Sequence, residues 1–563
     1  MNLIRCLSVL IFALCIPSNQ VLADATLSIS DKIIFAMKAG EAQSTVIAPN
    51  INLKCPAGRL LVSNDFLVRR TPYPDGAVVW RDLTDLDGNT GKATFGGMPN
   101  AQYFTMGTDH DLVSLKDGTV LLIDMVSSKA PISPKPQWFD DTYRDNKNSG
   151  DFGPGARTAI GIWRSTDCGT TFSFASLIET ADYGDGSCAW PQRPEWNPDA
   201  HHPLDMGGSD GISARVTADQ ERVIIVNQCV GYMPDPNVHD AFVLTNKRID
   251  KSLVFESADK GLTWKFVATF PKAAWRRSFV DHGQNVDFAV GPGVSVASRQ
   301  QDGTLNVEPT AQVVPNAGQG GLKTAGAGAL DATYGNIWGH VILTHVPGTK
   351  RTLIAEPVQM TRASSNVNSG YRVFLYDHSV EKFAELPPIL PASDQPDNFM
   401  MHLVAIDLGI GPVLLYWSEF DLATKTALVR GRFIFNRAEF SDDFIISRQN
   451  GQTATWALDP NAHYWYGDYQ TASAYMETTS AGPPGDTVTF DYFPMWIEAN
   501  RTVDAAHIRV TVPDKNGVVN KFAGDGSPSV SNLPFSDFSI VARNRELSEI
   551  EEDDADESAS EEH

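Results

Sequence analysis

Two copies of one eight-residue pattern constrain the fold of this chain more than any other feature. Both read Ser-x-Asp-x-Gly-x-Thr-aromatic, and they occupy residues 165–172 and 257–264. A short apolar run precedes each copy, and another follows it. An Asp accepts hydrogen bonds from amides of its own turn, and a Gly supplies the positive φ that a tight turn needs. Each copy therefore predicts a rigid hairpin turn, and the repetition predicts a fold built from a repeated β unit.

Two further strands are expected before each copy of the pattern. Residues 112–123 form two apolar runs around Asp117-Gly118, and residues 212–217 and 222–226 form a second such pair. A long polar insertion, residues 127–156, separates the first pair from its turn, and long loops of this kind often carry binding residues. Fainter units are expected to open near residues 286–298, 339–355, 401–417 and 467–471, the last continuing through 488–496 and 508–512.

Composition agrees with an all-β chain and excludes some partners. The sequence has 44 Gly, 34 Pro and 10% aromatic residues, which is typical of many short strands joined by turns. The net charge of −23 argues against nucleic acid or an anionic membrane surface as a partner. Residues 546–563 carry much of this charge and are expected to be disordered, either as a solubilising tail or as a weak cation binder.

The first 23 residues are typical of a secretory signal peptide. Arg5 precedes an apolar run at 6–16, and Val21-Leu22-Ala23 is a small-residue cleavage site. We expect cleavage near Ala23 and a secreted or periplasmic product. The apolar run is too short to span a bilayer, and no later stretch approaches the required length of about 20 apolar residues.

Four cysteines remain after cleavage, and their pairing stays open. Two disulfides have three possible connectivities, of which Cys168–Cys188 joins the nearest pair, and buried free thiols are the alternative. The other two cysteines are Cys55 and Cys229. Residues 82–89 resemble a fragment of a calcium loop, so either a structural calcium or an Asp/Gly-rich surface turn is expected there. No other cofactor and no metal-ligand set is predicted.

Both copies of the pattern resemble the Asp-box, or BNR, repeat of the sialidase superfamily. The resemblance implies a β-propeller with the box between the third and fourth strands of a blade, on the face away from the active site. The predicted fold is an all-β, sialidase-like propeller of about six blades over residues 105–515, and seven if the first 80 residues form a blade. Residues 24–104 supply either that blade or a closing strand, and residues 516–545 form a C-terminal strand or extension.

Residues where the innermost strands begin are the candidate catalytic groups, because those strand ends converge around the central channel of a propeller. Imidazoles among them suit general acid–base chemistry near neutral pH, although a structural role for each His is the alternative. The candidate catalytic residues are Asp109, His110, Asp210, His340, His402 and Tyr469; His282, Asn285 and Asp468 are also expected at strand starts.

Aromatic residues outside the predicted strands are candidate sugar-stacking platforms, since the apolar faces of sugars pack on such rings. These candidate substrate-binding residues are Trp138, Trp190 and Trp465, and packing between blades accounts better for Trp163, Trp264, Trp417 and Trp496.

True sialidase activity is not expected. In that superfamily the first blade begins with Arg-Ile-Pro, whose arginine grips the substrate carboxylate, and here residues 107–112 read Gly-Thr-Asp-His-Asp-Leu. The stretch is similar at Asp109-His110 to the start of propeller polysaccharide lyases, but residues 126–130 lack the second His of that pattern.

Two hypotheses of function remain. One is a glycan-cleaving hydrolase or lyase that acts at the channel mouth, and the other is a non-catalytic extracellular propeller that binds a glycan or a protein. In both, the chain is expected to be a monomer with a glycan or polysaccharide as its main partner.

Overall fold

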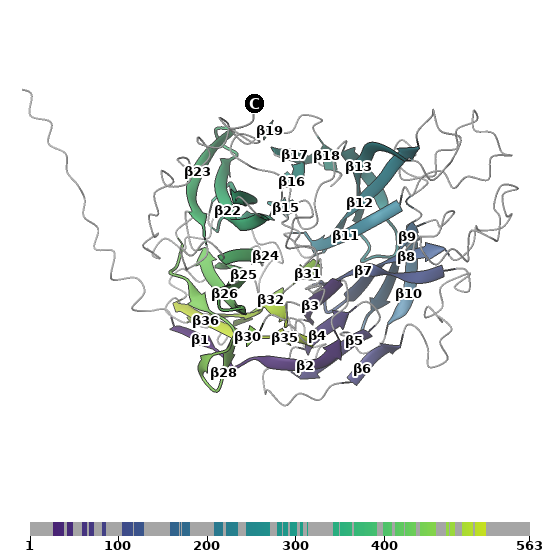
Figure 1. Cartoon of the computed structure of the whole chain (residues 1–563). Helices are drawn as coiled ribbons and strands as arrows, with labels where there is room; N and C mark the ends of the chain where they lie inside the picture. Colours follow the sequence, from purple (N-terminus) through teal and green to yellow (C-terminus); the bar gives the residue numbers. More distant parts are fainter. Residues whose placement is uncertain are drawn as a thin grey trace, which may run out of the picture.

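The computed structural model describes the strands of the chain and many of the turns between them (Figure 1). The described residues are 26–38, 42–48, 59–64, 67–72, 81–85, 104–115, 117–128, 158–167, 169, 172–178, 180, 208–217, 221–234, 244–270, 279–283, 285–290, 293–300, 305–307, 312–313, 342–347, 349–362, 365–390, 398–407, 411–421, 423–434, 440–457, 469–471, 473–478, 487–498 and 502–513. Within these ranges there is no α-helix, and no helix long and apolar enough to cross a membrane.

Five consecutive segments fold into antiparallel sheets in which neighbouring strands follow chain order. The first contains β7 (Phe104–Ser114), β8 (Val120–Ser128), β9 (Thr158–Ser165) and β10 (Ser173–Ile178). The second contains β11 (Gly208–Val216), β12 (Val223–Pro234), β13 (Leu244–Ser257) and β14 (Lys265–Phe270). The third contains β15 (Phe279–Asp281), β16 (Asn285–Val290), β17 (Gly293–Arg299) and β18 (Leu305–Val307), with β19 (Gln312–Val313) also on β17.

The remaining two of these sheets follow in the same way. One contains β20 (Ile342–His345), β21 (Arg351–Arg362), β22 (Ser365–Asp377) and β23 (Lys382–Ile389). The other contains β24 (Asn398–Ile406), β25 (Val413–Asp421), β26 (Thr426–Ile434) and β27 (Phe444–Ile445), with β30 (Trp456–Ala457) also on β26. A two-stranded ribbon, β28 (Arg448–Gln449) and β29 (Gln452–Thr453), lies beside it in sequence.

Three sheets combine strands from the beginning and the end of the chain. The first has the order β1 (Thr26–Ile29), β36 (Ile508–Pro513), β33 (Thr487–Phe493) and β32 (Ser473–Thr478). The second joins β2 (Ile33–Lys38), β35 (Thr502–Ala505) and β34 (Met495–Ile497). The third has the order β31 (Tyr469–Thr471), β3 (Ala42–Ala48), β4 (Arg59–Asn64), β5 (Leu67–Pro72) and β6 (Arg81–Asp85).

The sheets stand around a common centre, as the blades of a β-propeller do (Figure 1). First strands of successive sheets face the centre and neighbour one another, while fourth strands such as β10 and β23 lie at the outside. The predicted all-β propeller class is therefore confirmed, and the number of blades stays a prediction.

Apolar side chains fill the wedges between neighbouring sheets. Leu121 and Ile162 of the β7–β10 sheet form one buried cluster with Ile225 and Phe255 of the β11–β14 sheet. Corresponding clusters join each later pair of sheets as far as β24–β27. Of the indoles expected to pack between blades, Trp417 lies in a cluster that joins two sheets and Trp264 packs against another such cluster. Trp163 and Trp496 are fully buried.

Both eight-residue patterns form turns between the third and fourth strands of their sheets, as predicted. In the second copy, Ser257 Oγ donates to Asp259 Oδ1 at 2.9 Å and accepts from the amide of Gly261 at 2.8 Å. Asp259 also accepts from the Thr263 amide at 2.8 Å. The first copy repeats the Ser–Asp and Gly–Ser hydrogen bonds. Gly169 and Gly261 have φ of 73° and 84°, the conformation for which a turn needs glycine.

The second turn also contacts the neighbouring sheet. Ser176 of β10 donates its hydroxyl to the Gly261 carbonyl at 2.6 Å and accepts from Trp264 Nε1 at 3.0 Å. Lys260 forms an ion pair at 2.5 Å with Asp117, which lies in the turn between β7 and β8. The repeated turn therefore both closes its own hairpin and connects two sheets.

Replacing Ser257 by Ala is expected to lower the free energy of unfolding by about 1–2 kcal/mol, because the buried Gly261 amide loses its acceptor. Ser173→Ala is the matched control: this serine is exposed and its 3.5 Å contact is long, so a change below about 0.5 kcal/mol is expected. Thermal melting of both variants checks the prediction, and equal shifts would contradict it.

Two sequence expectations about strands were wrong. Residues 286–298 do not open a sheet, because the three-residue β15 precedes them and makes β16 and β17 the second and third strands. Tyr469–Thr471 pairs in parallel with β3 and not with residues 488–496, which are themselves divided at Pro494 between β33 and β34. Proline lacks the amide donor that a continuous ladder needs. Residues 82–85 of the proposed calcium loop lie in β6, paired with β5, and residues 86–89 lie outside the described residues.

Candidate functional site

Only part of the predicted site lies within the described residues. Asp109 and His110 are in β7, Asp210 is in β11, His402 is in β24 and Tyr469 begins β31. Of these, the structure describes the side chain of His110 alone. The candidates outside the described residues are His340, Asp468, Trp138, Trp190 and Trp465, as are Cys55, Cys168 and Cys188. Cys229 lies in β12, where only its backbone is described.

The strands that carry these candidates follow one another around the centre. In order, β11 neighbours β7, β7 neighbours β3, β3 neighbours β31, and β31 neighbours β24 (Figure 1). β20, whose first residue comes shortly after His340, neighbours β24 and β15. Arg215 of β11 donates to the Phe279 carbonyl of β15 at 3.0 Å and so connects the two ends of this series.

Three of these inner strands have a β-bulge at the candidate residue. Asp210 and Gly211 of β11 lie opposite one residue of β12, because the pairing shifts between Ser209 and Ile212. In β24 the pairing shifts between Met401 and Val404, on either side of His402. In β7 it shifts between Met106 and His110, a stretch that includes Asp109. Pairing also shifts in outer strands, for example between β22 and β23, but bulges re-aim side chains and are common beside active sites. These three are of interest because each lies at a candidate residue.

Buried charge links the inner strands to one another. His110 is 3% exposed and lies opposite Asp124 in β8. The next residue, Asp111, accepts from the Ala214 amide of β11 at 3.0 Å. Burial lowers the pKa of Arg215, while the charges of Asp407 and Asp111 act to raise it. Sequence reasoning missed Arg215 and Asp407, since neither stands in a motif.

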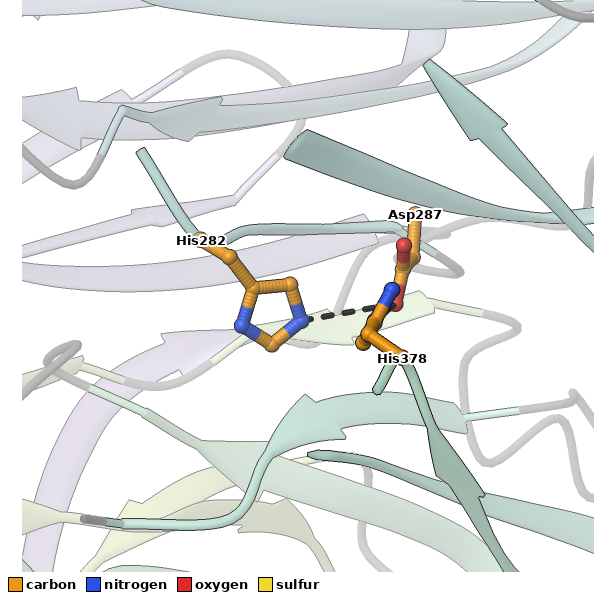
Figure 2. A group of neighbouring side chains, drawn as sticks. All are labelled: His282, Asp287 and His378. Carbon is orange, nitrogen blue, oxygen red and sulfur yellow. Dashed lines mark hydrogen bonds and ion pairs between the residues drawn. The ribbon is translucent and has the colours of Figure 1, made fainter. Parts of the chain in front are cut away.

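A second cluster, formed by His282, Asp287 and His378, joins the β15–β18 and β20–β23 sheets (Figure 2). Asp287 Oδ2 lies 2.8 Å from His378 Nε2 and 3.3 Å from His282 Nε2. Thr352 of β21 donates its hydroxyl to the same carboxylate and lies 2.8 Å from His282 Nε2. The two imidazole rings are edge-to-face, with centroids 5.1 Å apart.

Local structure places each member of this cluster. His282 follows β15, in the tight turn where its amide donates to the Asn285 carbonyl at 2.7 Å. The sequence suggested that His282 stands at the start of an innermost strand, but it comes after the end of one. Asn285 begins β16, the second strand. His378 begins the turn between β22 and β23, where the sequence shows only a degenerate copy of the repeated pattern.

The cluster lies on the face that carries the repeated turns. In a four-stranded meander, the first and third turns are at the same end of the sheet. Ion pairs between sheets show that these ends lie on the same face in neighbouring sheets. Lys260 pairs with Asp117 between the first two sheets, and Arg299 pairs with Glu256 at 2.5 Å between the second and the third. His282 and His378, in a first and a third turn, continue this series. The face opposite the repeated turns is the one predicted for catalysis.

Electrostatics favour a charged Asp287. Burial acts to raise its pKa, but hydrogen bonds and charge from His282 and His378 prevail and lower it to about 2. Its side chain is fully buried, whereas those of His282 and His378 are 12% and 11% exposed. The arrangement can hold either a proton network or a cation at one buried carboxylate.

No protein family and no curated protein matches the sequence. Solved structures show remote likeness, including a sialidase of Trypanosoma rangeli (10% identity, TM-score 0.32, covering 74% of this chain and 58% of that one). Another is the GH74 xyloglucanase of Xanthomonas campestris (12% identity, TM-score 0.33, covering 85% of this chain and 55% of that one). The chain therefore spans little more than half of either protein. The α-L-arabinofuranosidase of Fusarium graminearum matches at 11% identity and TM-score 0.27, covering 71% of this chain and 92% of that one. These values transfer no activity to this chain.

Proposed function

We propose that this chain is an exported propeller of the Asp-box type with a glycan-directed role at the channel mouth, as a hydrolase or a polysaccharide lyase. The observation that carries the proposal is the set of three bulges at Asp109–His110, Asp210 and His402 in inner strands around one centre. A bulge weakens the ladder locally, so three of them at polar residues are most simply explained by side chains aimed into a shared site.

The chemistry of these residues fits glycan cleavage. Carboxylate and imidazole groups supply the acid and base that glycosidic hydrolysis or elimination from a uronate requires. Loop aromatics such as Trp138, Trp190 and Trp465 would stack against sugar rings. The absent Arg-Ile-Pro argues against a sialic acid substrate, because nothing at residues 107–112 replaces its arginine.

The burial of His110 supports a second candidate function. An imidazole that is 3% exposed cannot reach a substrate without local opening, so the same face would then bind a glycan or a protein without cleaving it.

A glycan screen tests the proposal on the mature chain, with new reducing ends and the ultraviolet absorbance of unsaturated uronates as readouts. We expect turnover of a neutral or uronic glycan and not of a sialylated one. Asp210→Asn and His402→Ala are expected to lower kcat/KM at least about 100-fold, the usual scale for general acid–base groups. Ser173→Ala, exposed at the start of the outer strand β10 beside the first repeated turn, should leave it unchanged. Binding without turnover would select the second candidate. The absence of both binding and turnover would refute a glycan-directed role.

A further inference from the structure

Three side chains direct ligand atoms at one position between two sheets (Figure 2). Their ligand atoms, two imidazole nitrogens and a carboxylate oxygen, all lie within 4.8 Å of one another. In a tetrahedral Zn²⁺ site with bonds of about 2.0–2.1 Å, neighbouring ligand atoms are about 3.3 Å apart. Nε2 of His282 is 3.3 Å from Asp287 Oδ2, and Nε2 of His378 is 2.8 Å from it. A single ion therefore fits once the His378–Asp287 distance widens by about half an ångström and the two imidazole nitrogens, which lie within 4.8 Å of each other, come to about 3.3 Å.

The carboxylate has an oxygen that the protein does not satisfy. Asp287 Oδ1 is buried and has no hydrogen-bond partner among the described residues. The side chain is fully buried, so an unpartnered oxygen there carries its whole desolvation cost. An ion beside Oδ2 would offset the charge of the whole carboxylate, including the Oδ1 that the two histidines and Thr352 do not contact.

The site also has an entrance and a fourth ligand position. His282 and His378 are slightly exposed in turns at the surface, which gives an ion a path to the buried carboxylate. Thr352 Oγ1 is 2.8 Å from His282 Nε2 and 3.3 Å from His378 Nε2, beside the three ligand atoms. Either this hydroxyl or a water can complete four-coordination.

We propose that His282, Asp287 and His378 bind one divalent transition-metal ion of the Zn²⁺ class. Imidazole nitrogen with carboxylate oxygen suits zinc and its neighbours, whereas calcium and magnesium prefer oxygen ligands alone. The ligands come from two neighbouring sheets, on the face that carries the repeated turns. The ion is therefore structural: it joins the sheets and takes no part in chemistry at the channel mouth, and the inference is independent of the proposed function.

Cobalt substitution tests the site in the unaltered protein. The mature chain is stripped with a chelator, dialysed and titrated with Co²⁺. We expect saturation at one equivalent, with visible absorption bands of the four-coordinate ion, and loss of those bands when one equivalent of Zn²⁺ is added. A colourless protein would show a hydrogen-bonded network without a metal, and bands that Zn²⁺ does not displace would show that Co²⁺ binds at a different position. Either result would overturn the proposal.

Variants test which residues hold the ion. Asp287→Asn and His378→Ala should weaken Zn²⁺ binding at least about 100-fold, measured by calorimetry on protein with native circular dichroism. His507→Ala is the matched control, because His507 also pairs with a buried carboxylate, that of Asp491, at 2.5 Å, but has no second histidine beside it in the described chain. Unchanged affinity in His378→Ala, or equal loss in His507→Ala, would overturn the assignment. If neither site variant folds, the cobalt titration decides.

Discussion

Alanine in place of Gly411 is expected to destabilise the protein by about 2–5 kcal/mol, the sum of a backbone and a packing penalty. Gly411 has φ of +72°, a conformation that costs an L-residue about 1–2 kcal/mol. A methyl group there would lie 2.3, 2.5 and 2.9 Å from three ring atoms of Phe490. Phe490 is fully buried in β33 and cannot move aside without disturbing its own sheet.

Gly451 provides the matched control for this substitution. It has φ of +71°, but nothing lies within 4 Å of the position of its added methyl group. Gly451→Ala should therefore show the backbone penalty alone, about 1–2 kcal/mol. Calorimetric melting at one fixed scan rate compares the two, because large proteins often unfold irreversibly. Adding Phe490→Leu to Gly411→Ala should recover part of the loss. Equal melting shifts for the two alanine variants would contradict the packing argument.

Methionine in place of Lys32 is expected to cost about 3–5 kcal/mol at pH 8, because it leaves two buried carboxylates without their cation. Lys32 Nζ lies 2.7 Å from Glu498 Oε1 and 3.1 Å from Asp504 Oδ2. All three side chains are nearly buried, at 12%, 10% and 1% exposure. This cluster holds the connection between β1 and β2 against the strands β34 and β35.

The same substitution should have little effect in acid. Burial raises the pKa of Asp504 to about 7, the charge of Glu498 adds to this, and Lys32 opposes it. The folded protein therefore keeps a proton that the unfolded chain releases near pH 4, so this group's contribution to stability falls as pH rises from about 4 to about 7. Without Lys32 the pKa rises further, and the fall continues to higher pH.

Melting temperatures of the wild type and Lys32→Met at pH 5 and pH 8 check this prediction. The difference in melting temperature between the two proteins should be much larger at pH 8 than at pH 5. Lys260→Met is the control, since its ion pair with Asp117 is 39% and 24% exposed on its two sides and should be worth less than about 1 kcal/mol at either pH. If the difference in melting temperature between wild type and Lys32→Met does not change with pH, lost packing and not lost charge causes the destabilisation.

The sequence was most informative where structure depends on neighbouring residues. The turns at 165–172 and 257–264 were predictable because Ser257, Asp259 and Gly261 bond within five residues of one another. The hairpin at Asp117-Gly118 was predictable for the same reason, and Gly118 has the expected positive φ of 85°. These turns also marked a repeated β unit, and their resemblance to the Asp-box implied the propeller class.

Features that depend on contacts between sheets could not be read in this way. Asp287 and His378 are 91 positions apart and meet only because two sheets pack side by side. β15 was missed because three residues are too few to show a period. The bulges were also invisible, since they depend on how β7, β11 and β24 pair with their neighbours. What the sequence did supply at the candidate site was the residue types, and the backbone supplied their arrangement.

The sharing of sheets between the two ends of the chain has a consequence for how the protein is made. The Ser30 amide donates to the His507 carbonyl at 2.9 Å, and the His507 amide donates to the Ser30 hydroxyl, across 477 positions. During synthesis, residues 26–38 leave the ribosome early, while the strands that pair with them are among the last described strands to appear. Until then the final sheet has an open edge that invites pairing with other chains, and closing it spans nearly the whole described chain. Substitutions at this seam should therefore reduce the yield of folded protein more than the activity of molecules that have closed.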